Sequence, residues 1–204
     1  MKKHFVLAVL FSFAVSVLAS GRSVQHGIRI GALDDSAWDS SSWISAADAP
    51  VITGSIRGAN YLAADGASWF MSNVRNEQKV VSAKWMTSGL GVYDIYVNGV
   101  LIGQETLKPG FTHPKKTRLS FTYDVTDVIN VKSGAENQFS AQVTPGWWGD
   151  KIVTPHRHDG MVGKKCAFRG VLELTYADGT KKYYGTDLQN WKAGIAGPVT
   201  HAAI

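Results

Sequence analysis

Apolar residues fall in short runs in which they alternate with polar ones, and turn-forming residues separate the runs. Neighbouring side chains of a strand point to opposite faces, so a period of two predicts strands with one buried face. The alternation is clearest through Val81, Ala83 and Trp85, through Leu119, Phe121 and Tyr123, and through Phe139, Ala141 and Val143. Beyond Trp38 no helical period of useful length is present. This pattern predicts an all-β fold, one antiparallel β-sandwich.

One β-hairpin can be read residue by residue. Asn98-Gly99 stands between the apolar runs YDIYV and VLIGQ, and both residues accept the positive φ angles of a two-residue type I′ turn. The turn fixes the register, with the pairs Ile95–Ile102, Tyr96–Leu101 and Val97–Val100. Because both faces are then largely apolar, we expect this hairpin inside the sandwich and not on its rim. Asp178-Gly179 predicts a second hairpin.

Shorter signals add local detail. Residues 124–129 predict one helical turn, with Asp124 or Thr126 as the N-cap. The segment Lys108-Pro109-Gly110-Phe111 predicts a turn followed by a buried aromatic ring. Cys166 is the only cysteine, which rules out an intrachain disulfide, and we interpret it as a small buried hydrophobic residue.

The N-terminus predicts export. Residues 1–19 carry Lys2 and Lys3, a long apolar stretch, and small residues before Ser20, as in a cleaved secretory signal peptide. Residues 20–37 are rich in Gly and Ser and are expected to be a lead-in segment. After cleavage the protein is expected to be soluble, either secreted or periplasmic, with no membrane partner.

The net charge is +5, and the basic residues are scattered along the chain. Nucleic-acid binding usually needs a concentrated basic stripe or a known motif, so a nucleic-acid partner is not expected.

The run from Gly89 to Thr126 carries a sequence pattern that is typical of one family. It resembles the N-terminal β-sandwich domain of bacterial α-L-rhamnosidases, glycoside hydrolase family 78, which has a jelly-roll-like fold. The matching residues are Tyr93, Tyr96, Asn98, Gly99, Gly103, Leu107, Pro109, Gly110, Phe111, Thr112, Tyr123, Asp124, Val125, Thr126 and Asp127. Further matches are Ser42-Trp43-Ile44, Gly146-Trp147-Trp148-Gly149, Tyr176 to Thr180, Trp191 and Gly197-Pro198-Val199. The resemblance covers residues 38–204 in the family's order.

The resemblance implies an accessory role. In family 78 the catalytic carboxylates lie on a downstream (α/α)6 barrel, and no helical-barrel sequence is present here. We therefore expect no catalytic residue and no cofactor in this chain, and expect rhamnose-containing glycans and the catalytic barrel as its partners. The chain ends at Ile204 in the middle of the family pattern, which we interpret as truncation before the barrel.

Two groups of residues are candidates for contacts. Trp147 and Trp148 follow a predicted strand and are flanked by glycines, and flat aromatic rings suit the apolar face of a pyranose. The polar set that follows is His156, Arg157, His158 and Asp159. Packing against the catalytic barrel is the favoured interpretation, and direct sugar contact is the second. A Zn²⁺ site in the polar set is a weaker alternative than a solvated loop, so no metal is expected.

Two other classes of protein remain open at this stage. One is a stand-alone, lectin-like carbohydrate-binding module without an attached enzyme. The other is the similar sugar-binding domain of family 2 glycosidases, where related wording occurs. Pro109-Gly110-Phe111-Thr112 and the Gly-Trp-Trp-Gly element favour the rhamnosidase domain.

Overall fold

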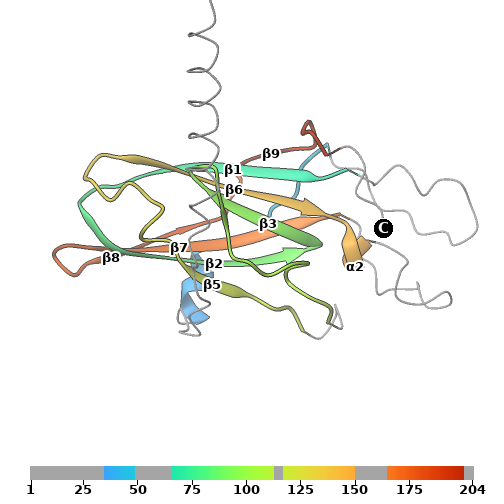
Figure 1. The fold of residues 1–204 in the computed structure, drawn as a ribbon, viewed down its shortest axis with the longest axis horizontal. Helices are drawn as coiled ribbons and strands as arrows, with labels where there is room; N and C mark the ends of the chain where they lie inside the picture. Colours follow the sequence, from blue (N-terminus) through green and yellow to red (C-terminus); the bar gives the residue numbers. More distant parts are fainter. Residues whose placement is uncertain (1–34, 49–65, 113–116, 150–164, 200–204) are drawn as a thin grey trace, which may run out of the picture.

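The computed structural model describes residues 35–48, 66–112, 117–149 and 165–199, which fold into two packed β-sheets (Figure 1). The strands are β1 (Ser68–Arg75), β2 (Val80–Leu90), β3 (Val92–Val97), β4 (Val100–Ile102), β5 (Phe121–Asp124), β6 (Glu136–Thr144), β7 (Ala167–Tyr176), β8 (Lys181–Gly185) and β9 (Lys192–Gly194). Two short helices, the 3-10 helix η1 (Asp35–Ser40) and α2 (Gly146–Gly149), complete the described elements.

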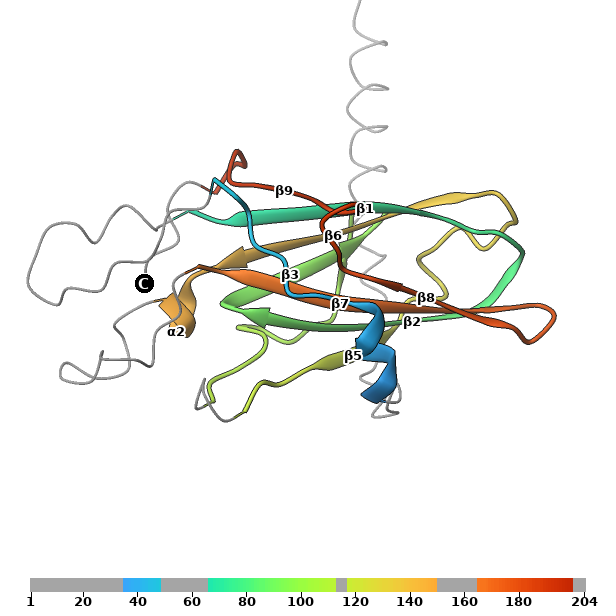
Figure 2. The same cartoon turned by 180° about the vertical axis from the view of Figure 1, so that it is seen from behind.

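The strands form a five-stranded sheet, in the order β4-β3-β6-β1-β9, and a four-stranded sheet, in the order β5-β2-β7-β8. All strand pairs in the described ranges are antiparallel. The reverse view shows the two sheets stacked face to face (Figure 2). The all-β antiparallel sandwich expected from the alternating pattern is therefore confirmed.

An aromatic cluster around Phe168 joins the two sheets. Its ring lies 5.9 Å from Phe70 of β1 and 6.1 Å from Tyr93 of β3, measured between ring centroids. Trp85, from β2 of the same sheet as Phe168, lies 6.2 Å away, and Trp191, just before β9, lies 5.7 Å away. Phe168 itself is fully buried. Since buried aromatic side chains contribute much of a core's apolar area, this cluster is the centre of the fold.

The hairpin turns at the predicted place. Asn98 and Gly99 have φ angles of 51° and 79°, and the three predicted pairs are all present, which confirms the register. Its predicted location inside the sandwich was wrong. β4 is an edge strand of the five-stranded sheet, and Leu101 is 49% exposed. Leu101 and its partner Tyr96 point to the outer face of the sheet, which the facing sheet does not cover.

Two other sequence predictions need correction. In β2 the pairing register shifts between Val80 and Ser82, so that Val80 points inward and Val81 is 51% exposed. A bulge inserts one extra residue into the strand, so the residues before and after it no longer follow one regular alternation between the two faces. In the turn after β4, Phe111 is 53% exposed and not buried, because Lys108 is the residue whose side chain enters the interior.

The remaining turns agree with the sequence. The Asp124 carboxylate accepts hydrogen bonds from the backbone N–H and the hydroxyl of Thr126, and Ile129 N–H donates to Val125 O, so Asp124 caps this turn. The β7–β8 hairpin turns at Asp178-Gly179, as predicted. Hydrogen bonds from the Thr180 hydroxyl and backbone N–H lower the pKa of Asp178.

The N-terminal part of the described chain is held on the outside of the four-stranded sheet. Arg169 donates to the carbonyl oxygens of Trp38 and Ser41, and its guanidinium lies 4.9 Å from the Trp38 ring centroid. Ala37 is buried beside Met86 and Val171. η1 thus begins within the predicted lead-in segment and packs against the sandwich.

Cys166 is buried, which confirms its interpretation as a small core residue. Burial disfavours the thiolate and raises the pKa of its thiol to about 12. We expect the folded protein to resist Ellman's reagent at about pH 8, because only the thiolate is the nucleophile. One equivalent should react after unfolding in guanidinium. Rapid labelling of the native protein would contradict the buried position.

Candidate functional site

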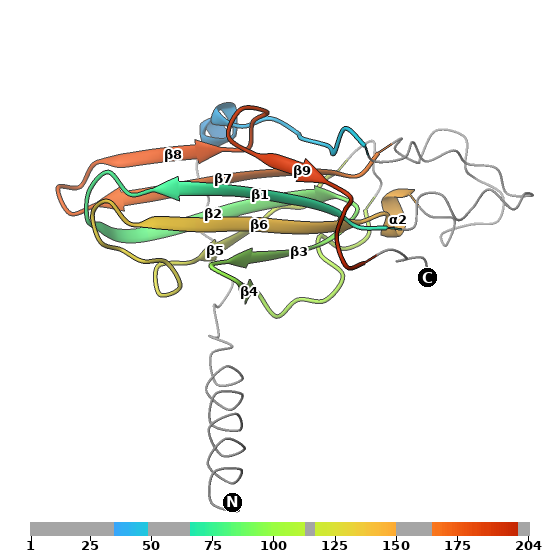
Figure 3. The ribbon, with the colours of Figure 1, turned by 90° about the horizontal axis from the view of Figure 1, so that it is seen from above.

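The site residues proposed from the sequence divide into two groups. Trp147 and Trp148 lie in α2, directly after β6, and the structure describes the side chain of Trp148. The polar set of His156, Arg157, His158 and Asp159 lies outside the described residues. The candidate site is therefore built around Trp148, at the end of the sandwich where β6 stops (Figure 3).

Backbone geometry and one hydrogen bond fix the orientation of Trp148. Gly146 opens α2 with a φ of 43°, and a Cβ at this position would lie 2.4 Å from Cγ2 of Val92. Only glycine allows this close approach of α2 to β3. The indole Nε1 of Trp148 donates to the Lys165 carbonyl at 2.9 Å. With its polar atom satisfied internally, the half-buried indole offers only apolar surface for further contacts.

Arg118 connects this tryptophan to a second one. Its guanidinium carbon lies 5.9 Å from the ring centroids of both Trp43 and Trp148. These distances are within the range of a cation–π contact. Three residues far apart in the sequence thus meet at one end of the fold. The sequence around each of them gives no sign of this contact.

The Phe111 surface, defined as Phe111, Arg118, Leu119 and Trp148, surrounds a shallow hollow. Phe111 is 53% exposed and Leu119 is 40% exposed. The hollow has a volume of about 50 Å³. Drug-sized ligands usually occupy pockets of about 300–1,000 Å³, so this hollow cannot enclose a pyranose. A sugar would instead lie across it as a shallow contact.

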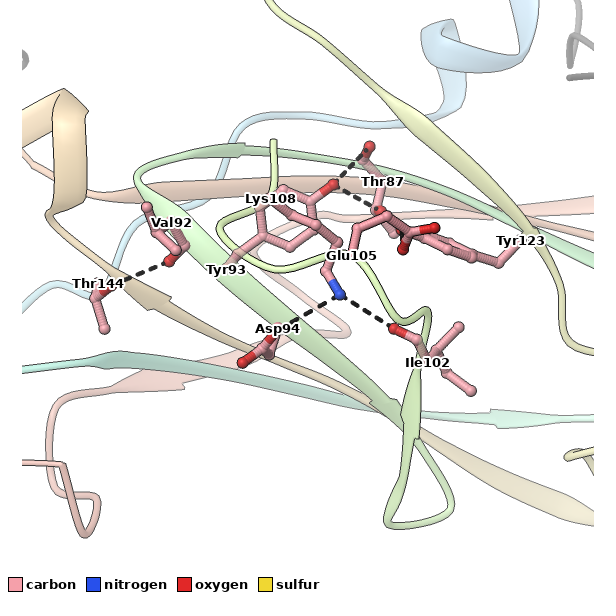
Figure 4. Close-up of polar contacts among 9 residues, drawn as sticks. All are labelled: Thr87, Val92, Tyr93, Asp94, Ile102, Glu105, Lys108, Tyr123 and Thr144. Carbon is pink, nitrogen blue, oxygen red and sulfur yellow. Dashed lines mark hydrogen bonds and ion pairs between the residues drawn. The ribbon is translucent and has the colours of Figure 1, made fainter. Parts of the chain in front are cut away.

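A buried lysine holds the loop that carries Phe111 (Figure 4). The ammonium of Lys108 donates to the Ile102 carbonyl at 3.2 Å and lies 3.5 Å from the Asp94 carboxylate. The carbonyl of Lys108 accepts the Tyr93 backbone N–H at 2.9 Å. Since Lys108 is only 1% exposed, these partners are what make its burial tolerable. Sequence analysis missed this residue, because a lysine before Pro-Gly has the composition of an exposed turn.

Two buried tyrosines complete the surroundings of Lys108. Tyr123 donates to a Glu105 oxygen at 2.9 Å, and Tyr93 donates to the Thr87 carbonyl at 3.2 Å (Figure 4). Burial raises the pKa of both phenols well above 10.0. The two hydroxyls therefore remain neutral donors at physiological pH. Their hydrogen bonds stabilise the loop and hold the Phe111 surface in place.

No three His, Cys, Asp or Glu side chains of the described residues come together as a metal site. Within the same ranges, no helix is long and apolar enough to cross a membrane.

Residues 78–204 match the family model described as the α-L-rhamnosidase N-terminal domain. The chain belongs to this family. The match supports the rhamnosidase domain over the family 2 glycosidase domain, as the Pro-Gly-Phe-Thr and Gly-Trp-Trp-Gly elements suggested.

Individual relatives agree with the family assignment. The chain is similar to an α-L-rhamnosidase of Streptomyces avermitilis, with 35% identity over 129 residues, or 62% of this chain. The structure of an α-L-rhamnosidase from Aspergillus terreus superimposes with a TM-score of 0.68 and 25% identity over 85% of this chain. The structure of Streptomyces avermitilis α-L-rhamnosidase complexed with L-rhamnose superimposes with a TM-score of 0.59 and 28% identity over 72% of this chain.

The rhamnosidase N-terminal domain is a small part of these relatives. The chain spans 12% of the length of the Streptomyces protein, and 18% and 14% of the two chains of known structure.

Proposed function

We propose that the chain is an accessory domain of a secreted α-L-rhamnosidase. The Phe111 surface packs against the remainder of the enzyme, and its tryptophan borders the rhamnose-containing substrate. The observation that carries this proposal is an exposed apolar surface around a rigidly held Trp148, on a domain that makes up only 12% of a relative's length.

An interface with another domain accounts for this surface best. Phe111 is more than half exposed, although the loop that presents it is anchored by the buried Lys108. Exposed apolar patches on otherwise soluble domains usually mark sites of protein contact. Arg118, stacked near both tryptophans, has the amphipathic character common at interfaces.

Contact with sugar is the second part of the proposal. The structure of the Streptomyces relative is described as complexed with L-rhamnose. In the present chain, the indole face of Trp148 provides a surface for the apolar side of a pyranose. A shallow contact of this kind supports an affinity on the order of millimolar, or about 4 kcal/mol.

Hydrolysis is assigned to a domain outside this chain. Glycoside hydrolysis needs a pair of carboxyl groups placed on either side of the scissile bond. Three carboxylates in the described ranges already have internal partners. Glu105 accepts a hydrogen bond from Tyr123, Glu173 pairs with Lys181, and Asp94 pairs with Lys108.

The interface can be tested on the isolated domain by sedimentation velocity. We expect self-association that increases with concentration, because the Phe111 surface is uncovered. Phe111→Ser should shift the protein toward monomer at an unchanged melting temperature. Leu188→Ser is the matched control, since Leu188 is 82% exposed but lies elsewhere on the chain. Monomeric behaviour of the unmodified domain at all concentrations, or equal effects of the two variants, would count against the interface.

A further inference from the structure

The two sheets leave a cleft of about 660 Å³ at one lateral edge of the sandwich. β9 has only three residues and pairs with Trp69, Phe70 and Met71 of β1. Beyond Met71, β1 has no strand neighbour on this side among the described residues. β8 is the edge strand of the opposite sheet and lies along the same side (Figure 3). Because β9 is short, it covers only part of this edge of the sandwich, and the cleft remains open beyond it.

The cleft lies away from the Phe111 surface. Its lining includes Arg75 and Glu77, at the end of β1 where Arg75 pairs with Glu136. α2 follows the opposite end of β6. A ligand in the cleft and a partner on the Phe111 surface would therefore occupy different ends of the domain.

Aromatic side chains form much of the cleft wall. Tyr184 of β8 lies on the wall formed by the four-stranded sheet, and Trp191 lines the cleft just before β9. The neighbouring Tyr183 points to the outer face of that sheet, where its hydroxyl donates to Glu173. Trp191 is half-buried, and its ring is held 5.7 Å from that of Phe168. The Tyr184 hydroxyl lies 3.3 Å from that of Tyr176. These contacts orient flat rings toward the space between the sheets.

Ser72 is the most informative polar residue of the cleft. It occupies an inward-facing position of β1, between Phe70 and Val74, and is only 5% exposed. Its hydroxyl has no hydrogen-bond partner among the described residues. Among the described residues, only Nε1 of Trp69 is a buried side-chain nitrogen or oxygen without a partner, so the Ser72 hydroxyl is accessible from the cleft. Because Ser72 lines the cleft, its hydroxyl is available to bond to an occupant.

The charges around the cleft favour a neutral ligand. Arg75 provides one positive charge at the rim, without a hydrogen-bond or ion-pair partner in the part of the chain that the structure describes. Asp187 provides a negative charge. Partial burial raises its pKa, but hydrogen bonds from Asn190 and Gln189 outweigh this, and the net pKa is lowered. Glu77 is already paired with Lys182.

We propose that this cleft is a carbohydrate-binding site separate from the Phe111 surface. One pyranose ring packs its apolar face on Trp191, and its hydroxyl groups bond to Ser72 and to Arg75 at the rim. Aromatic walls combined with a few polar groups of nearly balanced charge are the chemistry that recognises a neutral sugar. The cleft volume lies within the range of ordinary ligand sites.

The test uses the chain labelled with 5-fluorotryptophan, titrated with L-rhamnose and, separately, with D-galactose. Trp191→Phe assigns the ¹⁹F resonance of Trp191, and Trp148→Phe assigns that of Trp148. We expect a saturable shift of the Trp191 resonance with at least one of the two sugars. Ser72→Ala should weaken this binding roughly three- to ten-fold, the loss of one hydrogen bond. Ser140→Ala, on the outward-facing side of β6, is the matched control and should leave the affinity unchanged.

The outcomes separate this site from the proposed function. A saturable shift of Trp191 that Ser72→Ala weakens supports the cleft, whatever happens at Trp148. A shift confined to Trp148 supports sugar contact at the Phe111 surface and overturns the cleft site. No Trp191 response to either sugar, or a response unchanged by both Ser72→Ala and Arg75→Gln, also overturns it.

Discussion

Phe168→Ala is expected to lower the free energy of unfolding by about 3–5 kcal/mol, the usual cost of removing a buried phenyl ring. The ring is fully buried and contacts aromatic residues of both sheets, so its loss leaves a cavity where the sheets meet. Urea unfolding monitored by circular dichroism measures the loss. For a domain of this size, the melting temperature should fall by about 10 °C.

Leu101→Ala is the control for that experiment, because Leu101 is half exposed on the outer face of the edge strand β4. It should cost well under half as much. A loss below about 1 kcal/mol for Phe168→Ala would contradict the central position of this ring.

The double substitution Asn98→Val, Gly99→Val is expected to cost about 3 kcal/mol or more. Both positions have positive φ angles, and each β-branched residue placed there is strained by about 1–2 kcal/mol. The Asn98 side chain also donates to Asn137 and to the Val128 carbonyl, and it accepts the Gln138 N–H. The variant therefore loses the turn geometry and three hydrogen bonds together. Thermal unfolding measures the sum.

Asn98→Gly separates the two contributions. Glycine retains the positive φ angle and removes the side-chain bonds, so it avoids the strain at both positions and should cost about 2–4 kcal/mol less than the double variant. An unchanged melting temperature for the double variant would be incompatible with the turn at Asn98-Gly99.

Local sequence predicted the features that local chemistry decides. Asn98-Gly99 specified both the turn and the register, because the turn type leaves one way to pair the flanking residues. Inward-facing Phe139, Ala141 and Val143 were also found correctly, since β6 is regular. The alternation failed at Val81 because a bulge interrupts β2, and no residue type in that stretch marks a bulge.

Features that depend on strand order could not be predicted in this way. The exposure of Leu101 follows from the edge position of β4, which is set by pairing of β3 with the distant β6. The burial of Lys108 depends on partners from β3 and β4. The cleft beside Ser72 exists because β9 is short, and the contact of Arg118 with two tryptophans joins three separate segments.

Several residues that carry the family resemblance have structural roles around Lys108. Tyr93 and Tyr123 line its site, and Asn98 and Gly99 form the adjoining turn. Gly103 has a φ of 81°, and a Cβ there would lie 2.7 Å from the Tyr123 ring. The shared pattern therefore encodes how the loop is held, which explains why it identified the fold more securely than any contact residue.

The proposed accessory role has two consequences for the isolated chain: it contacts rhamnose-containing glycans and does not hydrolyse them. Saturation-transfer NMR on an α-L-rhamnosyl disaccharide, mixed with the purified chain, tests both parts in one sample. We predict saturation transfer to the rhamnosyl protons, while the anomeric signals of the intact disaccharide persist overnight. Absence of transfer would contradict the proposed sugar contact, and the appearance of free rhamnose would contradict the accessory, non-hydrolytic role.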